Sequence, residues 1–169
     1  MTARTTVQGG TTVRRIAITG HRELTADVGR AVEEGIRARL SPLGSALVGM
    51  SCLADGADTI FARLVVDAGA RLEVVVPALR YRDGLPRSHH ATYDELLSKA
   101  ALVHRLPHVE STPESHMEAG QHMVRRCDEL IAVWDGQPAR GHGGTADIVH
   151  LARENGRPVT VVWPEGAQR

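Results

Sequence analysis

The sequence predicts an α/β fold: a Rossmann-like, doubly wound, mainly parallel sheet of five to six strands with helices on both faces. Three observations predict it. Apolar runs of strand length alternate with amphipathic helical patterns along the chain. These runs are nearly continuous in Val, Ile and Leu, as expected of strands covered on both faces. Polar and glycine-rich segments follow the runs, at the place where such sheets bind ligands.

The first half of the chain is expected to form three strands and two helices. Residues 14–20 are the first strand, and apolar residues spaced four apart make the next helix, which stops before Ser41–Pro42. Residues 45–50 are the second strand, residues 58–68 the second helix and residues 71–77 the third strand. Strands separated by helices in this way predict parallel pairing.

The second half continues the alternation. A helix is expected to begin near Pro113, which suits a first turn, with Ser111 or Thr112 as its cap. The remaining expected elements are a helical stripe over residues 93–100, a weak strand within 101–107, a strand over 129–135, a helix over 145–155 and a strand over 157–163.

The chain of 169 residues is expected to be one domain. Residues 1–13 lack a hydrophobic signal region and are interpreted as a disordered leader, and residues 14–169 as the domain. Cys52 and Cys127 lie far apart, so no disulfide framework is expected. A reducing cytoplasm is therefore the favoured location.

The composition argues against several classes of function. Twenty Lys and Arg residues balance twenty Asp and Glu residues, so no net charge draws the chain to nucleic acid or a membrane surface. Aromatic residues make up 3%, which leaves few platforms for stacking single-stranded nucleic acid. No apolar run approaches the roughly 20 residues that cross a bilayer. A small-molecule ligand is therefore favoured over a nucleic acid or a membrane.

Candidate ligand-binding residues follow the first strand. Gly20 can bring the backbone close to a ligand, and His21 and Arg22 then supply an imidazole and a guanidinium at the entrance to the helix. The alternative is a turn glycine followed by two solvated polar groups.

A second group follows the second strand. Ser51, Asp55, Gly56 and Asp58 lie where a helix N-terminus offers free N–H donors. Asp58 could instead be a simple N-cap. Asp55 is less easily explained as a cap and could accept a ribose hydroxyl.

The third strand ends at Pro77 and leads into a long polar loop that contains Tyr81. Loops of this length in a compact domain often bind ligands or act as lids. The neighbouring residues His89 and His90 suggest a metal, but adjacent side chains diverge and no carboxylate or cysteine lies nearby at ligand spacing. No metal site and no required cofactor are predicted.

The segment after the strand at 129–135 carries the strongest signal. Its glycines expose N–H groups directly before a helix whose dipole favours an anion, so a phosphate could bind here, although a tight turn would use the same residues. It lacks the lysine of a Walker A loop, and it follows the penultimate strand rather than the first, unlike a dinucleotide fingerprint. Candidate ligand contacts in this segment are Trp134, which could also complete the core, Asp135, Gly141, Gly143, Gly144 and Thr145.

Catalytic candidates are Asp147, Asp135 and Arg126, with Asp55 and His21 as further acids or bases. Hydrolysis of an N-glycosidic bond needs one group to stabilise an oxocarbenium-like sugar and another to activate water or protonate the base. Spacing alone fixes no pair among these residues. Arg126 could also be a solvated cation that suits the end of its helix.

Five segments of the chain, in order, are ITGHREL, GMSCLADGADTIFA, LEVVVPALRY, CDELIAVWDG and GHGGTADIVHLA. Together they resemble the SLOG superfamily, the Rossmann-like group that contains the Lonely-guy phosphoribohydrolases and the DNA-processing protein A domain. The resemblance covers residues 14–163. It implies a nucleotide or nucleotide-derived ligand with its phosphate at residues 143–145, and a homodimer as in related proteins. Lonely-guy enzymes carry a glutamate three places after the threonine, where this chain has Ile148.

Two hypotheses of function follow. The first is a binding protein that holds a nucleotide or nucleotide-derived ligand through the glycine-rich loop. The alternative is a phosphoribohydrolase-like enzyme that cleaves the N-glycosidic bond of a nucleoside 5′-monophosphate, a reading weakened by the missing glutamate. A purely structural domain would leave the polar residues after several strands unexplained.

Overall fold

The computed structural model describes residue 10 and residues 12–169, so most of the expected leader lies outside the described residues. The predicted alternation of strands and helices is confirmed. None of the described helices is both long and apolar enough to cross a membrane. The elements are β1 (Arg14–Gly20), α1 (Ala26–Leu40), β2 (Leu47–Ser51), α2 (Ala57–Asp67), β3 (Arg71–Val76), α3 (His90–Ser98), β4 (Leu102–Arg105), α4 (Pro113–Arg126), β5 (Glu129–Val133), α5 (Thr145–Glu154) and β6 (Val159–Val161).

The described strands form one parallel sheet of six strands in the order β4-β3-β2-β1-β5-β6. From β1 the chain moves outward through β2 and β3 to β4, then returns through α4 to β5 on the other side of β1. The strand order therefore reverses between β1 and β5, which are in register from Ile16 opposite Glu129 to Gly20 opposite Val133. Open sheets of this kind bind ligands beyond the carboxyl ends of the strands at such a reversal.

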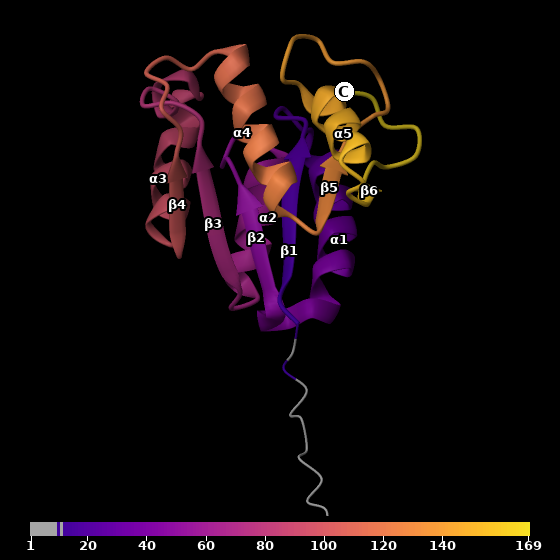
Figure 1. The fold of residues 1–169 in the computed structure, drawn as a ribbon. Helices are drawn as coiled ribbons and strands as arrows, with labels where there is room; N and C mark the ends of the chain where they lie inside the picture. Colours follow the sequence, from indigo (N-terminus) through magenta and orange to yellow (C-terminus); the bar gives the residue numbers. More distant parts are fainter. Residues whose placement is uncertain (1–9, 11) are drawn as a thin grey trace, which may run out of the picture.

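Helices cover both faces of the sheet, as predicted. In Figure 1, α4 and α5 lie in front of the sheet and α1 lies behind it. Strand side chains alternate between the two faces. Ile16 and Ile18 of β1 pack in the core with α1, α2 and α3, whereas Ala17 packs in the core with α4 and α5.

Of the two residues expected to cap α4, Ser111 and Thr112, the N-cap is Thr112. Thr112 accepts a hydrogen bond from the N–H of Ser115 (3.1 Å), and the Ser115 hydroxyl accepts one from the N–H of Thr112 (3.0 Å). This reciprocal capping box fixes the start of the helix. The second strand begins two residues later than expected, because residues 41–46 form a short 3₁₀ turn after α1.

Buried ion pairs lie at the end of the sheet where β1 and β5 begin. Glu129, the first residue of β5, accepts hydrogen bonds from Arg39 (2.7 Å) and Thr160 (2.8 Å). Burial raises the pKa of Glu129, but these partners together with Arg14 outweigh it and leave the pKa below its ordinary value. The ionised carboxylate is thus part of the folded structure at neutral pH.

Candidate functional site

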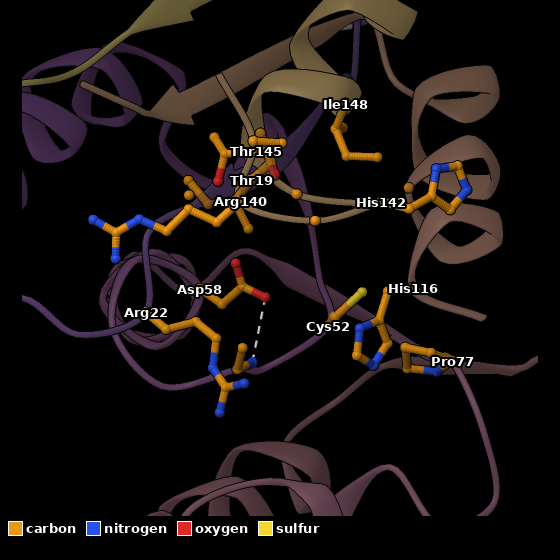
Figure 2. A pocket seen from close by; sticks show the side chains of 18 of the residues that line it. Thr19, Arg22, Cys52, Asp58, Pro77, His116, Arg140, His142, Thr145 and Ile148 are labelled. Carbon is orange, nitrogen blue, oxygen red and sulfur yellow. Dashed lines mark hydrogen bonds between the residues drawn. The ribbon is translucent and has the colours of Figure 1, made fainter. Parts of the chain in front are cut away.

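A cavity of about 340 Å³ lies at the carboxyl ends of the strands, beside the reversal of strand order. This volume is within the about 300–1,000 Å³ of small-molecule sites. Segments that follow β1, β2, β3, β5 and β6 line it, together with α4. Figure 2 shows labelled side chains from most of these segments. Of the ligand-binding residues expected from the sequence, those that line the cavity are Gly20, Arg22, Asp58, Pro77, Tyr81, Gly141, Gly143, Gly144 and Thr145.

The charge of the cavity wall is mainly positive. Arg22 after β1, Arg140 before α5 and Arg169 beyond β6 all line it. Asp58 is the one acidic residue among the lining residues that the structure describes. Such a wall favours an anionic ligand.

Two helices begin at this cavity. The N-cap of α5 is Gly144 and that of α2 is Gly56, and neither has a side chain that could accept from the first N–H groups of its helix. Thr145 and Asp58, in the first turns of α5 and α2, both line the cavity. The positive ends of two helix dipoles therefore add to the charge of the arginines.

The glycines around the cavity have structural reasons of their own. Gly56 has φ +81°, and a Cβ there would overlap the carbonyl group of Arg22 and lie 2.6 Å from the oxygen of His21. A Cβ at Gly20 would lie 2.6 Å from that of Ala57. The segments after β1 and β2 therefore cross in direct backbone contact, which only glycine permits.

The glycine-rich loop before α5 is also packed against protein. Gly143 has φ +80°, and a Cβ there would lie 2.8 Å from the carbonyl oxygen of Pro113 at the start of α4. The N–H of Gly143 donates to the carboxylate of Asp147 (2.9 Å). Asp147 thus holds the loop and is not among the residues that line the cavity. Gly141 differs, since a Cβ there would meet no atom within 4 Å.

The acid of the cavity wall, Asp58, has a strongly shifted pKa. Its side chain is buried, with 7% of the residue exposed, and Oδ2 accepts a hydrogen bond from the N–H of Ala54 (3.3 Å). Burial raises its pKa to about 7, against the opposing effects of the N–H groups of Ala54 and Cys52 and the charge of Arg22. Asp58 is not the N-cap considered from the sequence, because Gly56 holds that position.

His21 and Asp135 lie next to the cavity rather than in its wall. His21 Nε2 accepts a hydrogen bond from the N–H of Asp135 (3.1 Å) and lies 3.2 Å from its carboxylate, which also contacts Arg169 (3.4 Å). Burial lowers the pKa of His21, although Asp135 opposes this. The pair fastens β1 to the end of β5, and Asp135 orients Arg169.

Ser51 and Asp55 support the cavity without lining it. The Ser51 hydroxyl accepts from the N–H of Leu53 (3.0 Å), which has φ +59°, and donates to the carbonyl of Asp58 (3.3 Å). Asp55 accepts from Arg22 Nε (2.8 Å) and so holds a guanidinium of the cavity wall. Their placement explains both residues as supports of the segment between β2 and α2.

Trp134 does not reach the cavity either. Its indole N–H donates to the carbonyl of Gln137 (2.8 Å), and its ring packs with the core on the α4 and α5 face. Of the two uses considered from the sequence, this contact favours a role in the core.

Arg126 lies at the other end of the sheet, so the expectation that it could turn towards the site is wrong. Its carbonyl accepts from Arg15 Nε (2.9 Å) near the start of β1, whereas the cavity lies beyond the end of that strand. Because α4 runs antiparallel to the strands, its last turn is remote from their carboxyl ends. Arg126 lies in the last turn of α4. This position agrees with the alternative considered from the sequence, a solvated cation that suits the negative end of the helix dipole.

The two neighbouring histidines have separate hydrogen-bond partners, as divergent side chains should. His89 Nε2 lies 2.9 Å from the carbonyl oxygen of Leu53, and His90 Nε2 lies 3.0 Å from that of Leu85. Within the described part of the chain, no three His, Cys, Asp or Glu side chains form a group that could hold a metal ion.

Sequence analysis missed several residues of the cavity wall. Arg140 and His142 lie in the glycine-rich loop before α5, which the sequence had already indicated as a ligand site, so their position could have identified them. His116 and Cys52 had no comparable signal, because the first is one of several polar residues on α4 and the second reads as core. Arg169 lies beyond the last strand, and nothing in the sequence links it to Asp135.

The fold occurs in solved structures. DNA processing protein A from Streptococcus pneumoniae matches with a TM-score of 0.64 at 20% identity, over 88% of this chain and 50% of that one. The homologue from Helicobacter pylori, described with its single-stranded DNA binding mode, matches with 0.64 at 19% identity, over 89% and 65%. These likenesses show that the chain shares the Rossmann-like fold of these domains. It spans one half to two thirds of these two proteins.

A further structural neighbour is the molybdenum cofactor binding protein from Rippkaea orientalis, with a TM-score of 0.58 at 14% identity, over 88% of this chain and 75% of that one. Identities this low show a shared fold alone. No protein-family model matches the chain, and no curated protein matches it.

Proposed function

We propose that this protein binds a phosphorylated small molecule of nucleotide size in the cavity at the carboxyl ends of the strands. One observation carries the proposal: Arg22, Arg140 and Arg169 converge there with two helix N-termini that lack side-chain caps. Arginine and free helix N–H groups are the usual partners of a phosphate. The molybdenum cofactor binding protein from Rippkaea orientalis, which shares the fold, supports a small molecule as the ligand.

Binding is favoured over hydrolysis of an N-glycosidic bond. Ile148 lines the cavity at the place where the Lonely-guy resemblance requires a glutamate (Figure 2). Asp135 and Asp147, the carboxylates expected to catalyse, do not line the cavity and accept hydrogen bonds from the N–H groups of Gln137 and Gly143. An oxocarbenium-like transition state would therefore lack the paired carboxylates that glycosidases use.

The test is a thermal-shift screen with AMP, CMP, GMP, UMP, ADP-ribose, NAD and cyclic nucleotides. A ligand at 100 times its dissociation constant stabilises by about 2.7 kcal/mol, which should raise the melting temperature by about 5–10 °C. Wild type is compared with Gly144→Asp, whose carboxylate would cap α5 and occupy the place of the phosphate. His150→Asp adds the same charge on the exposed side of the same helix and controls for charge. A Cβ at Gly144 would lie 2.9 Å from that of Ala139, so Gly144→Ala controls for the added bulk and should keep the shift.

We expect wild type and His150→Asp to show the shift and Gly144→Asp to lose it while remaining folded. Chromatography of the same mixtures detects any release of free base. Base release would replace binding with the hydrolase hypothesis. The absence of a shift with every ligand would contradict both.

A further inference from the structure

The carboxyl group of Asp58 occupies an unusual position in the cavity wall. It lies in the first turn of α2, is 93% buried, and faces the loop that carries Arg140 and Thr145 (Figure 2). A buried acid in a wall built to attract anions needs a chemical reason, because an ionised carboxylate would repel the ligand that the arginines attract.

The hydrogen bonds of this carboxyl group determine which oxygen can carry a proton. Oδ2 accepts from the N–H of Ala54 at 3.3 Å, drawn as the dashed line in Figure 2, and the N–H of Cys52 also faces the group. The bond to Oδ2 is the one hydrogen bond between defined atoms that a described residue makes to this carboxyl group. The carbonyl oxygen of a carboxylic acid is a better acceptor than its hydroxyl oxygen, so Oδ2 takes the N–H bond and the proton of a neutral Asp58 lies on Oδ1, the oxygen turned towards the loop of Arg140 in Figure 2.

We propose that Asp58 binds the ligand as a neutral carboxylic acid, donating a hydrogen bond from Oδ1 to an anionic oxygen of a phosphate or carboxylate group, so that binding takes up one proton. The inference rests on the proposed function and deepens it. It assigns Asp58 to an acceptor oxygen of the ligand. The O–H donor would join the arginines and the free helix N–H groups around one anion.

The protonation equilibrium agrees with this geometry. Because burial raises the pKa of Asp58 to about 7, the free protein holds the acid about half neutral at neutral pH. A bound anion beside Oδ1 raises the pKa further, since like charges disfavour the ionised form. Affinity should therefore fall as pH rises above 7, where binding must first bring a proton to Asp58.

Other groups near Asp58 titrate elsewhere. Burial raises the pKa values of Cys52 and Tyr81 well above their ordinary values, so both stay neutral in this range. Burial lowers the pKa values of His116 and His21, so these lose their charge below pH 6.5 rather than above 7. The remaining charged or titratable groups that face the cavity or lie beside it are Arg22, Asp55, Asp135, Arg140, His142 and Arg169.

The experiment uses two anions that do not titrate in the relevant range: sulfate as the minimal probe and ADP-ribose, whose pyrophosphate is a diester. Titration calorimetry at pH 6, 7 and 8.5, in buffers of different ionisation enthalpy, gives the affinity and the number of protons taken up. For wild type we expect the affinity for both probes to fall about tenfold between pH 7 and 8.5, as one proton per site requires. Uptake should approach one proton at pH 8.5.

Asp58→Asn is the decisive variant. The N–H of Ala54 orients the amide so that its oxygen replaces Oδ2 and its NH₂ group replaces the O–H donor. We expect affinity close to that of wild type at pH 6, no loss up to pH 8.5 and no proton uptake. His116→Gln and His142→Gln should both keep the wild-type loss above pH 7.

The outcomes separate the two proposals. If both probes bind wild type with the same affinity at every pH, or Asp58→Asn keeps the loss above pH 7, the role of Asp58 is overturned and the anion site stands. If a histidine variant alone abolishes the pH dependence, that histidine replaces Asp58 as its cause. If neither probe binds wild type at pH 6, the proposed function fails as well.

Discussion

Replacing Gly56 with alanine tests the crossing that shapes the cavity. Gly56 has φ +81° and ψ −126°, a backbone conformation that L-residues rarely adopt and that costs them about 1–3 kcal/mol. The added Cβ would also lie 2.6 Å from the oxygen of His21, closer than the 3.0 Å below which real Cβ atoms are essentially never found. Opening the crossing stretches the hydrogen bond from the N–H of Ala57 to His21 (3.2 Å), worth about 1 kcal/mol. We expect a total loss of about 3 kcal/mol.

Urea unfolding followed by circular dichroism measures this loss. The control is Gly69→Ala at the other end of α2, where φ is +68° but a Cβ would meet no atom within 4 Å. Gly69→Ala should lose only the backbone term, about 1 kcal/mol. Equal losses in the two variants would show that the segments after β1 and β2 do not cross as tightly as described. The argument for the shape of the cavity would then be wrong.

Two further predictions concern buried acids. Without ligand, the raised pKa of Asp58 does not lower the free energy of unfolding at a pH below about 4, the pKa of an aspartate in the unfolded chain. As the pH rises from there to about 7, the loss of stability grows. Asp58→Asn should therefore stabilise the folded protein by up to about 4 kcal/mol at pH 8 and hardly at pH 4. Urea unfolding of the variant and the wild type at both pH values measures this, and equal effects at the two pH values would contradict it. Glu129→Gln should cost about 2 kcal/mol because it leaves Arg39 without its buried partner. Glu33→Gln, whose pair with Arg37 is exposed, should cost under about 0.5 kcal/mol; similar losses would refute the distinction.

The sequence was sufficient for the fold because periodicity and turn residues are local signals. The apolar run at residues 14–20 and the four-residue spacing of the following helix needed no knowledge of distant partners. The order of strands was not readable in the same way, since the pairing of β1 with β5 rather than with another strand depends on the path of α4. The start of β2 was predicted two residues too early, because the apolar pattern gives no sign of the 3₁₀ turn over residues 41–46.

The candidate site was predicted less completely, for a physical reason. Position after a strand places a residue near the cavity, but the direction of its side chain depends on partners elsewhere. Asp135 turns towards His21, and Trp134 turns towards Gln137, so neither lines the cavity. Asp58 was found by position, yet its neutral form depends on burial that no local pattern reveals. The expected ligand, the homodimer and the cytoplasmic location stay predictions.

The position of β1 at the centre of the sheet has a consequence for folding during synthesis. Arg15 and Asp128, which hydrogen-bond where β1 and β5 begin, are 113 positions apart in the chain. At about 5–20 residues per second, a ribosome needs roughly 5–20 s to add that length. Until α4 and α5 emerge, the face that carries Ala17, Met50 and Val75 has no cover. We therefore expect the nascent chain to expose an apolar surface for several seconds, and the cavity to be the last part of the protein to form.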